Sequence, residues 1–109
     1  MEELIVGAVV TLAFPYADFS SFKTRPALVV GNAEFHNLIL CQITSKSYMS
    51  KAAIKLERDE FASGGLELTS YIRPDKLFTV ESTLINGSVG KISNAKLKRV
   101  KASVQALFD

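Results

Sequence analysis

The sequence has few of the residues that form familiar catalytic sites. Its 109 residues include one cysteine (Cys41), one histidine (His36) and no tryptophan. A lone cysteine excludes an intramolecular disulfide, and a lone histidine excludes a two-histidine acid–base pair within one chain. Cys, His and carboxylates do not cluster at metal-ligand spacing, and no glycine loop of the phosphate-binding kind joins a strand to a helix. We therefore predict no metal and no cofactor, with Cys41 in the core and His36 in a surface turn.

Long apolar runs and an excess of charge are also missing. No run is long enough to cross a bilayer, and the start Met1-Glu2-Glu3 is not typical of a signal peptide, so we expect a cytoplasmic protein without membrane contact. The net charge of only +2 excludes a polycation. Basic residues gather only near the C-terminus, from Lys91 to Lys101. This run indicates either a solvated helix face or a surface that attracts phosphate, and the pattern leaves both open.

What is present is enough apolar sequence, 48%, to bury the core of one domain over residues 1–109. Alternating or wholly apolar runs predict strands at residues 4–14, 27–30 and 38–44. Further strands are expected at residues 53–56 and 66–80, with a last short one at residues 85–91 among small and turn-forming residues. Pro15 should end the first strand, and Pro74 should mark a bulge or an edge in the fifth. Gly64-Gly65 suggests a hairpin-like reversal. The sum is a mainly β protein, a strongly bent antiparallel sheet or barrel.

One helix should close the chain. Ser93 or Asn94 is a suitable N-cap, and Leu97, Val100, Val104 and Leu107 recur on one helical face. We expect this narrow stripe to pack on the sheet while the neighbouring lysines and Arg99 face water.

Polar groups at strand ends are the remaining candidates for chemistry. Arg25 precedes Pro26 where the loop of residues 16–24 should meet a buried strand, so Pro26 would hold Arg25 extended at that junction. Thr44-Ser45 ends another strand, and Arg73 and Asp75 flank Pro74. Each also has a structural explanation: Thr44 in a turn hydrogen bond, Arg73 with Asp75 in a surface ion pair, and Arg25 lying on apolar surface.

Together these groups permit RNA cleavage, a reaction in which the substrate's own 2′-hydroxyl is the nucleophile. The enzyme must orient the ribose and stabilise charge on the phosphate. A guanidinium and a hydroxyl can supply that stabilisation. The general base is not evident from the sequence.

Three blocks of the chain, in the right order, resemble the MazF/PemK toxins of type II toxin–antitoxin systems. The first is Phe14-Pro15 with Asp18 and the closing Lys23-Thr24-Arg25-Pro26. The others are Ile43-Thr44-Ser45 and the segment 70–80, SYIRPDKLFTV. The resemblance implies a small SH3-like antiparallel β-barrel of the CcdB/PemK/MazF type with a C-terminal α-helix, and a homodimer.

The resemblance also implies a function. It implies a metal-independent, sequence-selective endoribonuclease (an mRNA interferase) that cuts single-stranded RNA to 2′,3′-cyclic phosphate and 5′-hydroxyl ends and is inhibited by a cognate antitoxin. Arg25 would be the main catalytic residue, and Thr44 would bind the phosphate. RNA-binding or supporting roles would fall to the following residues: Asp18, Lys23, Ser45, Arg73 and Asp75.

Two other functions use the same kind of barrel. Gyrase poisons bind a protein and cleave nothing, but as that family is known they rely on a tryptophan near the C-terminus, and this chain has none. A non-catalytic barrel that binds RNA or a peptide is the third possibility. The presence of Arg25 and Thr44 favours the nuclease.

Overall fold

The computed structural model describes residues 5–15, 22–46 and 50–109. Its elements follow one another in this order: β1 (Ala8–Pro15), β2 (Phe22–Ala33), β3 (Asn37–Thr44), β4 (Ile54–Leu56), the 3₁₀ turn η1 (Arg58–Glu60), β5 (Phe61–Gly64), β6 (Ser70–Glu81), the 3₁₀ turn η2 (Ser82–Leu84), β7 (Ile85–Ile92) and α1 (Asn94–Ala106).

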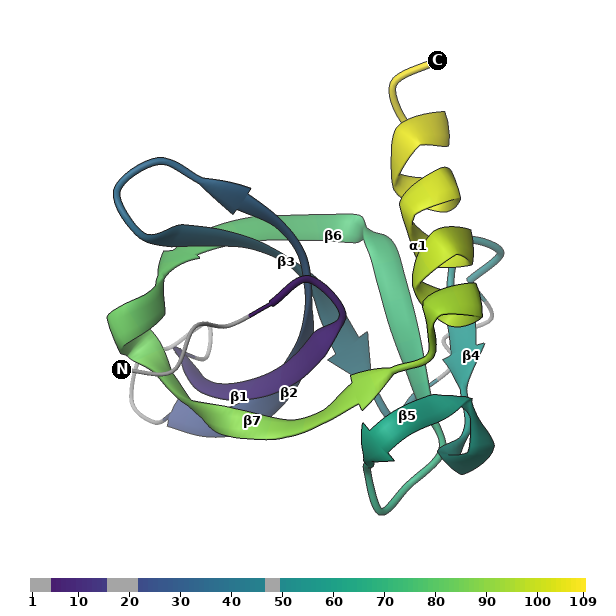
Figure 1. Cartoon of the computed structure of the whole chain (residues 1–109), viewed down its shortest axis with the longest axis horizontal. Helices are drawn as coiled ribbons and strands as arrows, with labels where there is room; N and C mark the ends of the chain where they lie inside the picture. Colours follow the sequence, from purple (N-terminus) through teal and green to yellow (C-terminus); the bar gives the residue numbers. More distant parts are fainter. Residues whose placement is uncertain (1–4, 16–21, 47–49) are drawn as a thin grey trace.

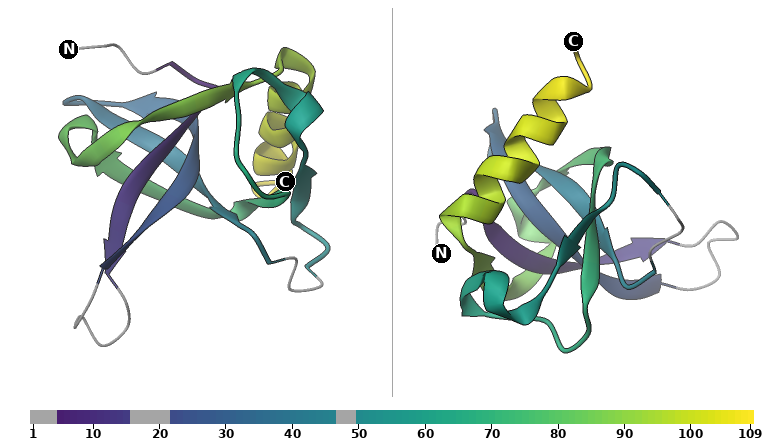
Figure 2. Two further views of the ribbon diagram at one scale, coloured as in Figure 1. Left: turned by 90° about the horizontal axis from the view of Figure 1, so that it is seen from below. Right: turned by 90° about the vertical axis from the view of Figure 1, so that its right-hand side faces the viewer.

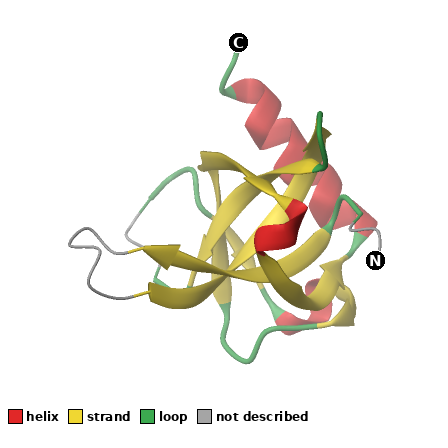
Figure 3. Cartoon of the chain, turned by 90° about the vertical axis from the view of Figure 1, so that its left-hand side faces the viewer, coloured by secondary structure: helices red, strands yellow, loops and turns green. Residues whose placement is uncertain are grey.

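The strands form one antiparallel sheet in the order β4-β6-β3-β2-β1-β7-β5. The sheet curls on itself, and α1 lies along one side of the curl with its C-terminal end projecting beyond it (Figures 1 and 2). Figure 3 shows the strands crossing one another as the sheet bends. The predicted fold class, a small β-barrel with a C-terminal helix, is confirmed.

Both faces of the central strands are buried, as the apolar run at residues 27–30 predicts. Leu28 of β2 belongs to a cluster that also takes in Val100 of α1, whereas its neighbours Ala27 and Val29 belong to a second cluster with Val10 of β1. Successive side chains of a strand point to opposite faces, so one strand feeds both clusters. The strands that carry the site are therefore held on two sides.

Several boundaries differ from those predicted. β1 begins at Ala8 because Gly7, with φ of +102°, turns the chain there. β2 begins at Phe22, five residues before the predicted apolar run. Residues 61–64 form a strand, β5, which pairs with β7 rather than reversing into β6, so the predicted hairpin at Gly64-Gly65 is wrong.

The prediction of a bulge at Pro74 is confirmed. Cys41 of β3 lies opposite Leu77, but the next residue, Gln42, lies opposite Arg73, so residues 74–76 of β6 have no partner on β3. Beyond Ile72, β6 has no pairing with β4 either. Pro74 therefore lies at a position of β6 where neither neighbouring strand needs a hydrogen bond from a backbone N–H.

The helix begins as predicted, with Ser93 Oγ accepting a hydrogen bond from the Lys96 N–H at 3.3 Å. Val100 is buried, and Leu97 and Val104 pack on the first cluster. Leu107, the last residue of the predicted apolar face, is exposed because the C-terminal end of the chain projects beyond the sheet (Figure 1). Lys96 is buried, against expectation, and its Nζ lies 2.6 Å from Glu60 Oε2. No helix in the described part of the chain is long and apolar enough to cross a membrane.

Candidate functional site

The candidate site forms where β2 and β3 part. From Ala27 onward β2 pairs with β3, but residues 22–26 pair only with β1. Pro26 stands at this point, so its missing N–H breaks no pairing with β3. The end of β3 instead pairs with β6, Thr44 opposite Tyr71. The parting strands leave a hollow of about 400 Å³, called here the Arg25 hollow.

Within the described residues, three segments line the Arg25 hollow. The start of β2 contributes Thr24, Arg25 and Pro26, and the end of β3 contributes Ile43, Thr44 and Ser45. The third wall is the segment before β6 with its first residue: Leu66, Glu67, Leu68 and Ser70. The structure therefore brings together Arg25, Thr44 and Ser45, three residues predicted from two separate blocks of the sequence.

Arg25 lies inside a strand and not at the predicted loop–strand junction. It is the fourth residue of β2, opposite Leu12 of β1, and it is half-buried. The extended backbone that Pro26 favours in the preceding residue fits this position. A guanidinium carried by a paired strand has a fixed backbone, which is better for aligning it on a phosphate than a loop would be.

Thr44 is a buried polar residue on the wall facing β2, with 8% of its surface exposed. Its Oγ1 accepts a hydrogen bond from the Lys46 N–H at 3.2 Å, which is the turn bond expected for a threonine at a strand end. A hydroxyl that accepts one bond still has its own proton to donate. The structural and the phosphate-binding explanations of Thr44 are thus compatible.

The third wall was not predicted from the sequence. Ser70 Oγ donates a hydrogen bond to the Leu68 carbonyl at 3.0 Å and so fixes the turn that leads into β6. Glu67, exposed at this wall, is the carboxylate among the described residues that line the hollow. Residues 65–69 connect β5, which pairs with β7, to β6, which lies next to β3 in the sheet. Their position beside the end of β3 therefore depends on long-range strand order, which no local sequence pattern indicates.

Arg73 and Asp75 do not line the Arg25 hollow. They form a two-point ion pair across Pro74, Nε to Oδ1 at 3.1 Å and Nη2 to Oδ2 at 3.0 Å. The hydrogen bonds from Arg73 hold the pKa of Asp75 below its ordinary value, although partial burial opposes them. Ser45 is exposed at the rim of the hollow. Lys23 lies in β2 opposite Phe14, and Asp18 is outside the described residues.

Cys41 and His36 lie where the sequence predicts. Cys41 is fully buried, and burial, with a smaller contribution from the charge of Asp75, raises the pKa of its thiol to about 12. The thiol is therefore protonated and unreactive near neutral pH. His36 is exposed in the turn between β2 and β3.

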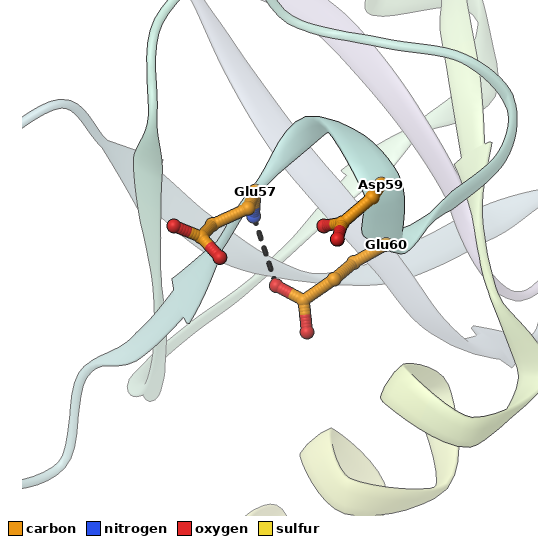
Figure 4. A group of neighbouring side chains, drawn as sticks. All are labelled: Glu57, Asp59 and Glu60. Carbon is orange, nitrogen blue, oxygen red and sulfur yellow. Dashed lines mark hydrogen bonds between the residues drawn. The ribbon is translucent and has the colours of Figure 1, made fainter.

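One group of acidic side chains lies close enough together to hold a metal ion. Glu57, Asp59 and Glu60 place carboxylate oxygens within 4.8 Å of one another, the single such group in the described part of the chain (Figure 4). Glu60, however, already accepts hydrogen bonds from the Glu57 N–H at 2.9 Å and from Lys96. Burial alone would raise the pKa of Glu60, but these bonds and the charges of Lys96 and Arg99 outweigh it and lower that pKa. The cluster serves as a cap for η1 and an anchor for α1.

The Arg25 hollow thus combines a strand-borne cation, a hydroxyl donor and a carboxylate on three walls. Such a set can bind an oxyanion and handle a proton beside it.

Comparison with known proteins identifies the family. The family model of PemK-like, MazF-like toxins of type II toxin–antitoxin systems matches residues 6–108. No curated protein matches the chain.

Solved structures share the fold at low sequence identity. An endoribonuclease in complex with its cognate antitoxin from a mycobacterial species is 14% identical, with a TM-score of 0.75 over 99% of this chain and 95% of that one. The MazE–MazF complex of Deinococcus radiodurans is 17% identical, with a TM-score of 0.76 over 94% of each chain. The MazF-mt6 toxin of Mycobacterium tuberculosis is 16% identical, with a TM-score of 0.70 over 94% of this chain and 96% of that one. Since the family model spans nearly the whole sequence, the chain belongs to the PemK-like, MazF-like toxins of type II toxin–antitoxin systems.

Proposed function

We propose that this toxin is a sequence-selective endoribonuclease that cleaves single-stranded RNA in the Arg25 hollow without a metal and is blocked by a cognate antitoxin. The observation that carries the proposal is that Arg25 and Thr44, from two different strands, line the same hollow. The fold that the chain shares with an endoribonuclease bound to its cognate antitoxin and with a MazE–MazF complex supports it. The cytoplasmic location expected from the sequence stays a prediction.

In the proposed reaction, one residue from each wall of the hollow has a chemical role. The ribose 2′-oxygen attacks the neighbouring phosphorus, forming the 2′,3′-cyclic phosphate, and the bond from phosphorus to the 5′-oxygen breaks. Arg25 stabilises the charge that grows on the phosphate oxygens and protonates the departing 5′-oxygen, while the Thr44 hydroxyl donates to a phosphate oxygen. The proton of the 2′-hydroxyl needs an acceptor, and we assign it to Glu67.

The test is cleavage of a long single-stranded RNA by purified protein in EDTA, with the new ends mapped. We expect discrete fragments ending in cyclic phosphate. Arg25→Ala should lower the rate by at least about 10²-fold, because its loss removes a donor that acts mainly in the transition state. Thr44→Val should slow the reaction, and Thr44→Ser, which keeps the hydroxyl, should restore much of the rate.

Each variant must be compared at equal fold content by thermal unfolding. Arg25→Ala should shift the melting temperature by only a few degrees, since the core clusters do not include Arg25. Intact RNA with the wild-type protein, across many sequences and salt concentrations, would contradict the nuclease and favour a barrel that binds without cleaving.

A further inference from the structure

A second hollow adjoins the Arg25 hollow. It also has a volume of about 400 Å³ and is lined by Arg58, Gly64, Gly65, Leu66 and Glu67. We call it the Arg58 hollow. Leu66 and Glu67 line both, so the two hollows are separated only by this segment. A ligand that passes over Glu67 would therefore reach both arginines.

Arg58 is the cation and Glu67 the carboxylate among the described residues that line the Arg58 hollow, and the carboxylate of Asp59 lies beside those of Glu57 and Glu60. Glu57 is paired with Lys55, with Nζ to Oε1 at 3.4 Å, and Glu60 is paired with Lys96 at 2.6 Å. Arg58 itself is exposed, and among the described residues its side chain has no hydrogen bond or ion pair. Its guanidinium is thus available to a phosphate.

The backbone at this hollow is fixed by close packing. Gly64 has φ of +64°, and a side chain there would lie 2.6 Å from the Cα of Gly90 in β7. The side of the hollow formed by β5 is therefore held against β7, while Arg58 stands at the start of η1. A rigid wall with a cation beside it can position a nucleic-acid backbone.

From this arrangement we propose that the Arg58 hollow binds the phosphate immediately 5′ of the attacking nucleotide. The inference rests on the proposed cleavage reaction. In an RNA strand the attacking ribose lies between two phosphates, the one that is cleaved and the one on its 5′ side. With the cleaved phosphate at Arg25 and the 2′-hydroxyl at Glu67, the next anion along the strand in the 5′ direction reaches Arg58.

The charged residues that line the two hollows match this assignment. Cations stand at the two positions that receive phosphates, and the carboxylate of Glu67 stands on the shared wall, where a phosphate would be repelled but a ribose hydroxyl can donate a hydrogen bond. The order cation, carboxylate, cation corresponds to the order phosphate, ribose, phosphate. Arg58 is therefore a binding residue that orients the strand, and it does not touch the reacting atoms.

The test measures binding to an RNA that cannot be cleaved, a strand with a 2′-deoxy nucleotide at the mapped attacking position. One version carries a neutral methylphosphonate in place of the phosphate 5′ of that nucleotide. For the wild-type protein we expect the neutral linkage to weaken binding by on the order of fivefold. Arg58→Ala should weaken binding of the normal strand by a similar factor and should be insensitive to the neutral linkage. Its plot of log affinity against log salt should also be shallower by about 0.7.

Matched variants separate this contact from a general loss of charge. Lys101→Ala removes an exposed cation from α1 that lines neither hollow, so it should change neither the affinity nor the salt dependence measurably. Arg58→Lys should retain most of the binding.

The possible failures are distinguishable. If the wild-type protein cleaves RNA but Arg58→Ala still responds to the 5′ neutral linkage, the inference is wrong and the proposed function stands. A response only to a neutral linkage on the 3′ side of the cleaved phosphate would reverse the strand direction and overturn the inference. Absence of cleavage by the wild-type protein would instead contradict the proposed function.

Discussion

At the scale of single residues, Lys96 shows how a charge becomes part of the core. Its side chain is 7% exposed, and its partner Glu60 is 30% exposed. A buried ammonium without a partner would be costly, so this pair ties the first turn of α1 to η1. The Glu60 carbonyl also accepts a hydrogen bond from the Ser93 N–H at 2.8 Å, which adds a second link between the same two elements.

The Glu60 pair predicts a pH-dependent stability. The pKa of Glu60 is lowered in the folded protein, so its stabilisation is fully present above the ordinary pKa of a glutamate and is lost as the pH falls through the folded-state pKa. Glu60→Gln should therefore cost about 1.5 kcal/mol in unfolding free energy at neutral pH and less at an acid pH below the ordinary pKa of a glutamate, where Glu60 of the wild-type protein becomes increasingly protonated. Urea denaturation at both pH values measures this difference.

Glu81→Gln is the matched control for that experiment. Glu81 is exposed at the end of β6, and it has no ion pair among the described residues. We expect its substitution to stay within about 0.5 kcal/mol at either pH. A cost of Glu60→Gln that is equal at neutral and acid pH would show that Glu60 acts through packing and not through its charge.

At the scale of elements, the junction of β5 with β7 depends on glycine. Gly64 has a left-handed φ, and any side chain on it would collide with the backbone of Val89 and Gly90. Gly64→Ala should therefore destabilise the protein by more than the 1–2 kcal/mol that the left-handed conformation alone costs. Thermal or urea unfolding of the variant measures the loss.

The adjacent glycine supplies the control. A side chain on Gly65 would meet no atom within 4 Å, and its φ is outside the left-handed region. Gly65→Ala should be neutral or slightly stabilising, because it reduces the freedom of the unfolded chain without a collision. Equal effects of the two substitutions would contradict the close packing of β5 on β7.

The elements also show what the sequence can and cannot reveal. The period-two pattern of residues 38–44 and the proline at position 74 locate β3 and the bulge of β6, because these features depend on neighbours in the chain. The pairing of β5 with β7 and the burial of Lys96 depend on residues 26 to 36 positions away, which no local pattern contains. The same holds for the site: the resemblance indicates Arg25 and Thr44, whereas Glu67 joins them only through the sheet order.

At the scale of the whole molecule, the electrostatic field is weak, so the RNA binding that we propose must come from local cations. The net charge is +2, with 13 basic and 11 acidic residues. Long-range steering by such a chain is modest, so contacts such as those proposed for Arg25 and Arg58 decide where a strand lies. The basic face of α1, formed by Lys98, Arg99 and Lys101, is exposed, which agrees both with a solvated helix face and with a surface that attracts phosphate.

The resemblance to the MazF/PemK toxins implies a homodimer, and the mass of the protein in solution tests this prediction. The described surface exposes several large apolar side chains, among them Phe35, Leu68 and Leu84, and burial of such groups between two copies would favour association. We expect sedimentation equilibrium to give twice the mass of one chain at micromolar concentration. Because association stabilises only the folded chain, the melting temperature should also rise with protein concentration. A single-chain mass together with a melting temperature independent of concentration would contradict the dimer, and the Arg25 and Arg58 hollows would then have to bind RNA within one chain.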